Sequence, residues 1–174
     1  MTRYPDSARR LRIRVAVFAC IAAVALAVDQ LTKALALRLL GETVSIRLIP
    51  GLLGLRLVHN PGASLGLGSN VTWIISLIAL VASIAMVWAV VRTISMKWTV
   101  ALGFAFAGAV GNLIDRVAYA DGFLNGKVVD FIDYGWSVGN VADIFLMGAG
   151  IGIVALVVFG EPFDAGSLEE HSED

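Results

Sequence analysis

The chain has 174 residues, of which 58% are hydrophobic and only 16% are charged, and its mean hydropathy is +0.83. Soluble domains average about 45–50% apolar and about 25% charged residues, so this composition excludes a disordered chain and argues against an ordinary soluble globule. The net charge of −1 lacks the basic excess of a nucleic-acid-binding protein. The single cysteine excludes an internal disulfide and a cysteine-rich zinc site.

Four long apolar runs contain no charged residue, and they cover residues 15–28, 71–91, 98–114 and 144–160. A bilayer core of about 30 Å needs about 20 mostly apolar residues per helix, and a backbone in lipid must satisfy its own hydrogen bonds. We therefore predict an all-α polytopic membrane protein with four transmembrane helices. We expect residues 1–163 to form one domain, and the acidic tail 164–174 to be disordered and cytoplasmic.

The loop after the first run alternates apolar and polar residues, as half-buried strands do. Residues 44–49 alternate, Pro50 and Gly51 mark a turn, and residues 53–58 alternate again. The pattern predicts a small sheet or hairpin that lies outside the lipid.

Lysine and arginine are nearly balanced between the two sides of the membrane, but five arginines cluster before the first run, within residues 3–14. This cluster favours cytoplasmic N- and C-termini and places the two long loops outside. A rival interpretation makes the first run a cleavable signal peptide. We favour a helix, because residues 29–40 continue as good helix formers. Cys20 is interpreted as a small apolar core residue.

Ionisable residues fall at the ends of the apolar runs. Asp29 and Lys33 are four residues apart on one helical face, where opposite charges pair. The spacing alone favours an ion pair at the membrane interface, and the functional alternative is a pair that orients a site. At the end of the third run, Asn112, Asp115 and Arg116 lie within about one helical turn. Glycines at positions 108 and 111 would let a neighbouring helix approach closely.

The fourth run is preceded by Asn140 and Asp143, whose spacing places both on one helical face, and Asp130 lies among β-branched and aromatic neighbours. Singly, Asp130 could be a solvated loop carboxylate and Asp143 a carboxylate that stabilises a helix N-terminus. Ionisable groups near the membrane are functional candidates by default. Two carboxylates in a low-dielectric site share a proton, which is the chemistry of an aspartic hydrolase.

Other catalytic chemistries have less support. The sequence has two histidines and no His-Glu-x-x-His motif, which argues against a zinc site. It has no Gly-x-Ser-x-Gly nucleophile elbow and no phosphate-binding loop. A serine–lysine pair of Ser64 and Lys33 is conceivable from the sequence but has no further support.

The chain resembles the bacterial lipoprotein signal peptidases, also called signal peptidase II. Five strings match the family's motifs in chain order and cover nearly the whole chain. The strings are Asp29-Gln30-Leu31-Thr32-Lys33, residues 60–66 (NPGASLG), residues 108–116 (GAVGNLIDR), residues 128–132 (VVDFI) and Asn140-Val141-Ala142-Asp143.

This resemblance implies an aspartic endopeptidase that needs no metal or other cofactor and cuts prolipoproteins just before a diacylglyceryl-modified cysteine. It makes Asp130 and Asp143 the catalytic pair. It also implies substrate-binding residues, site-supporting residues and a small β-cradle on the outer membrane face. The substrate-binding residues would be Asn60, Asn112, Arg116 and Asn140. The supporting residues would be Asp29, Lys33 and Asp115, with Asp115 fixing the third helix beside Arg116 and remaining the main rival for a catalytic role.

Three positions depart from the family pattern: Leu65 and Gly139 stand where aromatic residues are common, and Ile144 replaces a small residue. We expect these changes to alter the shape of the pocket. We also expect the protein to act as a monomer in the cell membrane, with membrane lipid and prolipoproteins as partners. The alternatives are a small ion-coupled transporter subunit, which would need acids near the bilayer centre and broken helices, and a non-catalytic scaffold whose helices pack through Gly108, Gly111 and Gly148.

Overall fold

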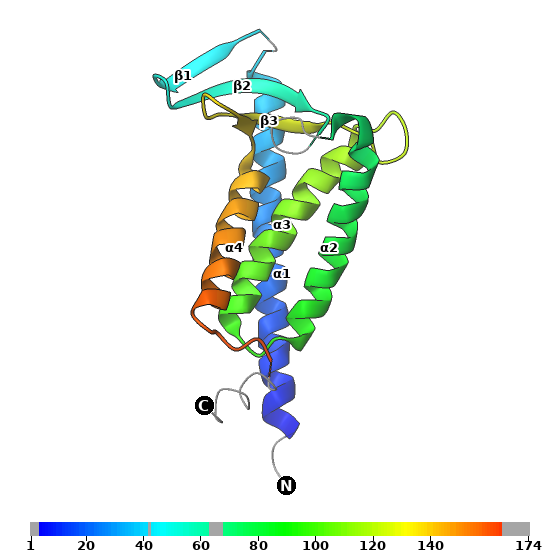
Figure 1. Cartoon of the computed structure of the whole chain (residues 1–174), viewed down its shortest axis with the longest axis vertical. Coiled ribbons are helices and arrows are strands. Elements are labelled where there is room, and N and C mark those ends of the chain that lie inside the picture. Colours follow the sequence, from blue (N-terminus) through cyan, green and yellow to red (C-terminus); the bar gives the residue numbers. More distant parts are fainter. Residues whose placement is uncertain (1–3, 42, 63–67, 165–174) are drawn as a thin grey trace.

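The computed structural model describes residues 4–41, 43–62 and 68–164, which form a bundle of helices with a small sheet across one end (Figure 1). The long helices are α1 (Tyr4–Leu39), α2 (Thr72–Arg92), α3 (Met96–Ala118) and α4 (Val141–Val158), and a short 3-10 helix η2 (Ser69–Val71) precedes α2. Among the described residues, four helices are long and apolar enough to cross a membrane, as the four apolar runs predict.

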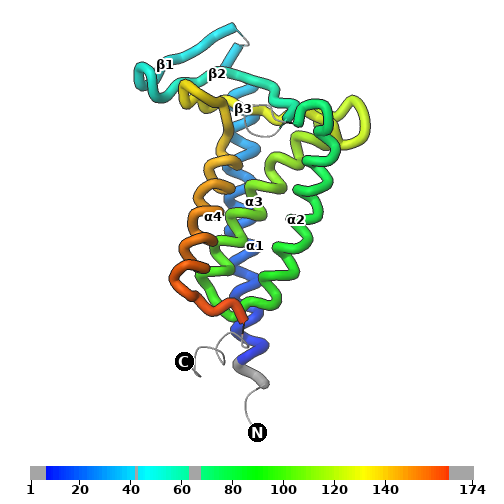
Figure 2. The backbone as a smooth tube through the Cα atoms, viewed as in Figure 1, coloured from blue at the N-terminus to red at the C-terminus, as the bar shows by residue number. Residues whose placement is uncertain are grey.

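Helix α1 has 36 residues and is therefore about 54 Å long. It continues without a break past Asp29, as expected from its helix-forming sequence, and extends beyond the other helices at the end that carries the termini (Figure 2). The N-terminus and the last described residues lie at this end, opposite the sheet. We call it the terminal end, and the other the sheet end.

Helix α3 is the centre of the bundle and contacts α1, α2 and α4. In its most apolar stretch 61% of the residues are buried within the protein, against 11–17% in the other three helices. Two glycines make this packing close. A Cβ atom on Gly108 would lie 2.6 Å from the Ala142 backbone oxygen, and one on Gly111 would lie 2.6 Å from Oδ2 of Asp29. The expected role of Gly108 and Gly111 is therefore confirmed.

The sheet has four antiparallel strands in the order β1 (Ser45–Ile49), β2 (Leu53–Asn60), β3 (Val128–Asp133) and β4 (Val138–Gly139). The hairpin β1–β2 and its turn at Pro50 and Gly51 were predicted. The second long loop then adds β3 and β4, so that Asp130 pairs with Val58. Every residue of β1 is exposed, so the expectation of a half-buried first strand is wrong. An edge strand that projects from the bundle has no protein layer to bury one of its faces.

Two further expectations are corrected. Cys20 is exposed on the surface of α1 rather than buried in the core. Gly148 faces open space, because nothing lies within 4 Å of the position where its Cβ would stand, so it does not mediate helix packing. The acidic tail after Asp164, together with Ser64 and Leu65, lies outside the described residues.

Candidate active site

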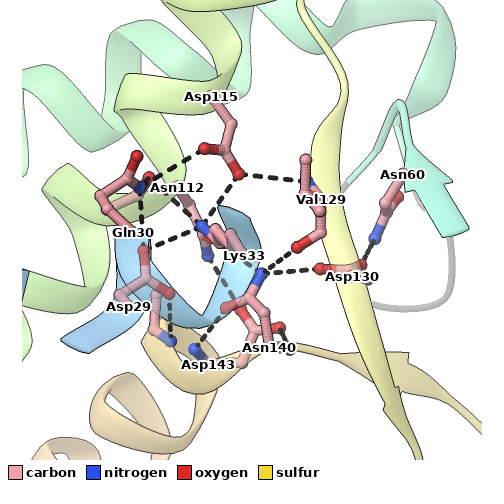
Figure 3. Close-up of polar contacts among 12 residues, drawn as sticks. Asp29, Gln30, Lys33, Asn60, Asn112, Asp115, Val129, Asp130, Asn140 and Asp143 are labelled. Carbon is pink, nitrogen blue, oxygen red and sulfur yellow. Dashed lines mark hydrogen bonds and ion pairs between the residues drawn. The ribbon is translucent and has the colours of Figure 1, made fainter. Parts of the chain in front are cut away.

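Polar residues from each of the five sequence motifs meet at the sheet end, where α1, α3, α4, β2 and β3 converge (Figure 3). The centres of α2, α3 and α4 contain no charged residue. An ion path through the bilayer would need polar groups at mid-depth, and this arrangement instead gathers them at one membrane boundary.

Asp130 lies in β3 and is only 2% exposed, so it is not the solvated loop carboxylate that its position alone suggested. Its Oδ2 accepts a hydrogen bond of 2.9 Å from the Asn60 amide, and its Oδ1 accepts one of 2.6 Å from the Asn140 amide. Burial raises its pKa to about 7, the charge of Asp143 contributes in the same direction, and the hydrogen bonds from Asn60 and Asn140 oppose the shift. Asp130 can therefore hold a proton near neutral pH.

Asp143 lies in the first turn of α4 and is part of a capping box with Asn140. Its Oδ2 accepts a 3.0 Å hydrogen bond from the Asn140 backbone N–H, and the Asn140 side chain accepts from the Asp143 N–H at 3.1 Å. Its Oδ1 accepts a 2.8 Å hydrogen bond from the Asn112 amide. The helix terminus and Asn112 thus fix both oxygens of this carboxylate.

Two asparagine side chains link the two aspartates. The Asn112 oxygen accepts hydrogen bonds from the Asn140 amide at 3.0 Å and from Nζ of Lys33 at 3.1 Å. Its NH₂ group is therefore free to donate to Asp143, while the NH₂ group of Asn140 donates to Asp130. One continuous network thus fixes the orientation of both carboxylates.

A buried ion cluster lies directly beneath this network. Nζ of Lys33 lies 3.0 Å from Oδ2 of Asp29 and 2.9 Å from Oδ2 of Asp115, and all three side chains are at most 3% exposed. The ion pair of Lys33 with Asp29 was predicted from their spacing in the sequence. Asp115 was expected to act beside Arg116, but its ion-pair partner is Lys33. Charges buried this deeply are tolerated only when they are paired and hydrogen-bonded.

Each carboxylate of this cluster also binds the backbone just before a candidate catalytic aspartate. Oδ1 of Asp29 accepts from the N–H of Ala142 at 2.9 Å, and Oδ2 of Asp115 accepts from the N–H of Val129 at 3.1 Å. Lys33 therefore joins two carboxylates, one of which holds the start of α4 while the other holds β3. This geometry fixes the separation of the two elements that carry Asp143 and Asp130.

Gln30 was quoted within a motif but given no role by the sequence. Its amide nitrogen lies 3.0 Å from Oδ2 of Asp29, 3.2 Å from the Gly111 oxygen and 3.4 Å from Oδ1 of Asp115. It therefore adds hydrogen bonds to both carboxylates of the ion cluster. In the sequence, only its position directly after Asp29 could have indicated this role. Its partners on α3 are more than 80 residues away from it along the chain.

Arg116 projects from α3 and is 5% exposed. One of its terminal nitrogens donates a 2.6 Å hydrogen bond to the Gly62 oxygen, at the end of β2. Its Nε is buried and has no hydrogen-bond partner among the described residues. A buried guanidinium N–H without a partner is costly, and Arg116 also lines the pocket in front of the two aspartates.

A pocket of about 710 Å³ opens in front of the two aspartates. Helix α2 contributes Ile75 and Ile78, and α4 contributes Leu146 and Met147, so the side that faces the helices is apolar.

All four predicted substrate-binding side chains lie at this site, although Asn140 stands behind the pocket wall. Ile144 lines the pocket, as its departure from the family pattern led us to expect. The pocket is also lined by two aromatic residues that the sequence did not single out, Tyr134 and Trp136. Within residues 4–41, 43–62 and 68–164, no cluster of three or more histidine, cysteine or acidic side chains could hold a metal ion.

The sequence matches the family model described as signal peptidase (SPase) II over residues 21–159. The lipoprotein signal peptidase of Bifidobacterium longum subsp. infantis is 67% identical over 165 residues, which cover 95% of this chain and 91% of the relative. That of Mycolicibacterium smegmatis is 40% identical over 167 residues, covering 95% and 69%.

Two solved structures are similar to this chain in fold. A bacterial membrane enzyme determined by the in meso method at 2.3 Å resolution superposes with a TM-score of 0.74 at 30% identity, covering 83% of this chain and 88% of the other. A second bacterial membrane enzyme, determined at 1.9 Å, gives a TM-score of 0.71 at 31% identity, covering 82% and 93%. The four-helix membrane fold predicted from the sequence is confirmed.

Proposed function

The chain belongs to the signal peptidase II family, and we propose that it works as an aspartic endopeptidase whose catalytic pair is Asp130 and Asp143. It is a membrane protease that removes signal peptides from prolipoproteins. Neither a transporter nor a scaffold is favoured, because the matching family is a peptidase family and the centres of α2, α3 and α4 contain no charged residue.

The observation that carries this proposal is the shared amide network of the two aspartates at a pocket. Asn140 binds Asp130 through its side chain and Asp143 through its backbone, and Asn112 binds both Asp143 and Asn140. Two carboxylates held at one buried site cannot both ionise easily, so they titrate as a unit that retains one proton. The raised pKa of Asp130, about 7, supports the assignment of this proton to Asp130.

In the proposed reaction, ionised Asp143 takes a proton from water while Asp130 donates its proton to the scissile carbonyl oxygen. The water oxygen bonds to the carbonyl carbon and forms a tetrahedral intermediate. Arg116, which lines the pocket, would donate from its guanidinium group to the substrate near this intermediate. Collapse of the intermediate breaks the C–N bond, and the proton held by Asp143 passes to the amine of the departing cysteine. One hydroxyl proton of the intermediate returns to Asp130, which restores the starting state of the pair.

The pocket fits a substrate that is part peptide and part lipid. Apolar side chains of α2 and α4 line the pocket on the helix side, where Ile78, Leu146 and Met147 lie. We propose that the two acyl chains of the modified cysteine lodge between these helices, which makes the lipid an element of specificity. We propose that a monomer is the active form, because the hydrogen-bond network that joins Asp130 to Asp143 closes through Asn112 and Asn140 of the same chain.

We propose that the termini are cytoplasmic and that the site faces the outside of the cell membrane. The basic stretch of α1, which includes Arg9, Arg10, Arg12 and Arg14, lies at the terminal end (Figure 1). Basic residues are enriched on the cytoplasmic side. The two aspartates at the opposite end then lie at the depth where a signal helix leaves the bilayer.

The test is cleavage of a synthetic prolipoprotein peptide that carries a diacylglyceryl cysteine, by the purified protein in lipid or detergent. Wild type is compared with Asp130→Asn, Asp143→Asn and Asp115→Asn, and each variant is checked for folding by thermal melting. We expect cutting before the modified cysteine, with a loss of about 10²- to 10⁴-fold for each catalytic variant and a partial loss for Asp115→Asn.

Two outcomes would contradict the proposal in different ways. Loss of activity in Asp115→Asn with survival of Asp130→Asn would keep the peptidase but move the catalytic pair. No cleavage by folded wild type, with several substrate sequences tried, would contradict the peptidase assignment itself.

A further inference from the structure

The turn between β3 and β4 contributes an aromatic wall to the pocket. Tyr134 and Trp136 both line the cavity, and their rings lie 6.4 Å apart with a 30° angle between their planes. Trp136 is 75% exposed, whereas Tyr134 is half-buried, so Tyr134 is the member that faces the interior. Neither residue belongs to the asparagine and carboxylate network described above.

The turn holds Tyr134 in a fixed place. The Tyr134 N–H donates a 2.8 Å hydrogen bond to the Ser137 oxygen, which closes a two-residue hairpin. Gly135 has φ of +83°, as the first central residue of a type II′ hairpin requires. Asp133 accepts from the Gly135 N–H at 2.8 Å and pairs with Arg56 of β2 at 3.3 Å. The backbone that carries Tyr134 is therefore tied to the sheet.

The absence of a side chain at Gly139 brings the Tyr134 ring close to the catalytic pair. Gly139 pairs with Ile132 across the β3–β4 ladder. A Cβ on Gly139 would lie 2.8 Å from Oδ2 of Asp143 and 3.5 Å from Cε2 of Tyr134. The carboxylate and the ring edge thus flank the same glycine. Gly139 departs from the family pattern, and here its bare backbone leaves room for the tyrosine.

The Tyr134 hydroxyl keeps its proton under all ordinary conditions. Burial raises its pKa above the usual value of a phenol, and the negative charges of Asp143 and then Asp130 raise it further. A neutral phenol is a hydrogen-bond donor. Asp130 and Asp143 already accept hydrogen bonds from asparagine amides. The Tyr134 hydroxyl can therefore donate to an oxygen atom of the substrate.

We propose that Tyr134 is a substrate-contacting residue whose ring packs against the peptide beside the scissile bond and whose hydroxyl donates a hydrogen bond to a carbonyl of that peptide. This inference rests on the proposed function. The β3–β4 turn lies outside the membrane-spanning helices, whereas the apolar wall of the pocket comes from α2 and α4. The contact is therefore with the peptide and not with the acyl chains.

The kinetic test compares Tyr134→Phe and Tyr134→Ala with wild type on the diacylglyceryl-cysteine peptide. Loss of one neutral hydrogen bond predicts a KM about 3- to 10-fold higher for Tyr134→Phe, with kcat within about twofold. Removal of the ring predicts a KM about tenfold or more higher for Tyr134→Ala. Tyr119→Phe is the matched control, because Tyr119 is exposed at the same end of the protein and lines a separate depression. We expect it to behave like wild type.

A second measurement needs no change at position 134. The chain has only three tyrosines, so 3-fluorotyrosine labelling gives three fluorine resonances, which Tyr4→Phe and Tyr119→Phe assign by elimination. The added ligand is the same peptide with a reduced CH₂–NH bond at the cleavage position. We expect the Tyr134 resonance to shift on its addition and the Tyr119 resonance to stay in place.

The inference is overturned if wild type cleaves the peptide while Tyr134→Phe shows unchanged KM and the Tyr134 resonance does not move. A fall in kcat and in melting temperature without a change in KM would also overturn it, since that pattern indicates a structural role. Neither result touches the proposed function. Failure of wild type to cleave the peptide contradicts the proposed function instead.

Discussion

The two ends of the bundle each hold a lysine paired with a carboxylate, and the two pairs differ in their surroundings. At the sheet end, the side chains of Lys33 and Asp29 are 3% and 0% exposed. At the terminal end, Lys97 and Glu161 lie 2.6 Å apart, but their side chains are 70% and 21% exposed. Water solvates and screens the second pair, whereas the first relies entirely on protein partners.

At the terminal end, Phe163 holds the segment after α4 against the turn between α2 and α3. The Phe163 oxygen accepts from Thr93 Oγ1 and from the Ile94 N–H, both at 2.8 Å, and the Phe163 ring meets Trp98 edge-on at 5.3 Å. These contacts tie the segment after α4 to the turn between α2 and α3. These residues do not line the site pocket.

The comparison shows where this protein retains costly charges. Transfer of a charge out of water carries a penalty of several kcal/mol even after relaxation. The sheet end nonetheless buries Asp29, Lys33, Asp115, Arg116 and Asp130. Stability alone does not require such a cluster, because apolar residues of similar volume would pack as well. The ion cluster instead positions the elements that carry Asp130 and Asp143.

The largest expected effect comes from Lys33→Met. The substitution leaves two carboxylates buried without their cation, so we expect a loss of about 3–5 kcal/mol of unfolding free energy. Thermal or denaturant unfolding in detergent measures it. A melting temperature equal to that of wild type would mean that the ion cluster is not the structural link inferred here.

Gly139→Ala is expected to have the next largest effect. Its Cβ would lie 2.8 Å from Oδ2 of Asp143, which the capping box holds in place, so the carboxylate must move. Displacement of a catalytic group costs on the order of 10²-fold in rate. The cleavage assay measures the loss. Gly148→Ala on the same helix bundle is the control, since nothing lies within 4 Å of its new methyl group.

The pH dependence of the stability of Asp130→Asn, compared with wild type, tests whether the pKa of Asp130 is raised in the folded protein. Since its pKa is raised to about 7, folded wild type holds a proton that the unfolded chain releases above about pH 4. Wild-type stability therefore falls as pH rises, until the folded pKa of about 7 is passed. We expect Asp130→Asn to melt higher relative to wild type at about pH 8 than at about pH 5, by about 5 °C or more. The same difference at both pH values would contradict the raised pKa.

The smallest expected effect is that of Lys97→Met at the terminal end. An exposed ion pair contributes little, so we expect the melting temperature to change by no more than about 2 °C. Cleavage activity should stay within about twofold. A loss of stability similar to that of Lys33→Met would remove the distinction between the two ends.

The sequence was sufficient for the parts of this account that depend on local pattern. Apolar run length predicted the four helices, and the placement of polar residues at the run ends identified Asp130 and Asp143 as candidates. The hairpin of the first loop followed from alternation. Half-burial of β1 and burial of Cys20 were wrong, because a pattern does not say which face of an element meets another element.

Contacts between distant segments could not be predicted in the same way. Lys33 and Asp115 are 82 positions apart in the sequence, and only the packing of α1 on α3 brings them together. β3 and β4 were not predicted. They lie in the second long loop, and their pairing with β2 depends on the helices that bring the two loops to one end. Tyr134 carries no motif, and its relevance follows from the neighbouring Gly139.

The central claim is that Asp130 and Asp143 share a catalytic proton, and the pH profile of kcat/KM tests it most directly. This profile reports ionisation of the free enzyme. We expect kcat/KM for the diacylglyceryl-cysteine peptide to fall on the alkaline side with an apparent pKa near 7, as the pair loses its proton. A rate that stays level or rises from about pH 7 to about pH 9 would contradict the shared proton.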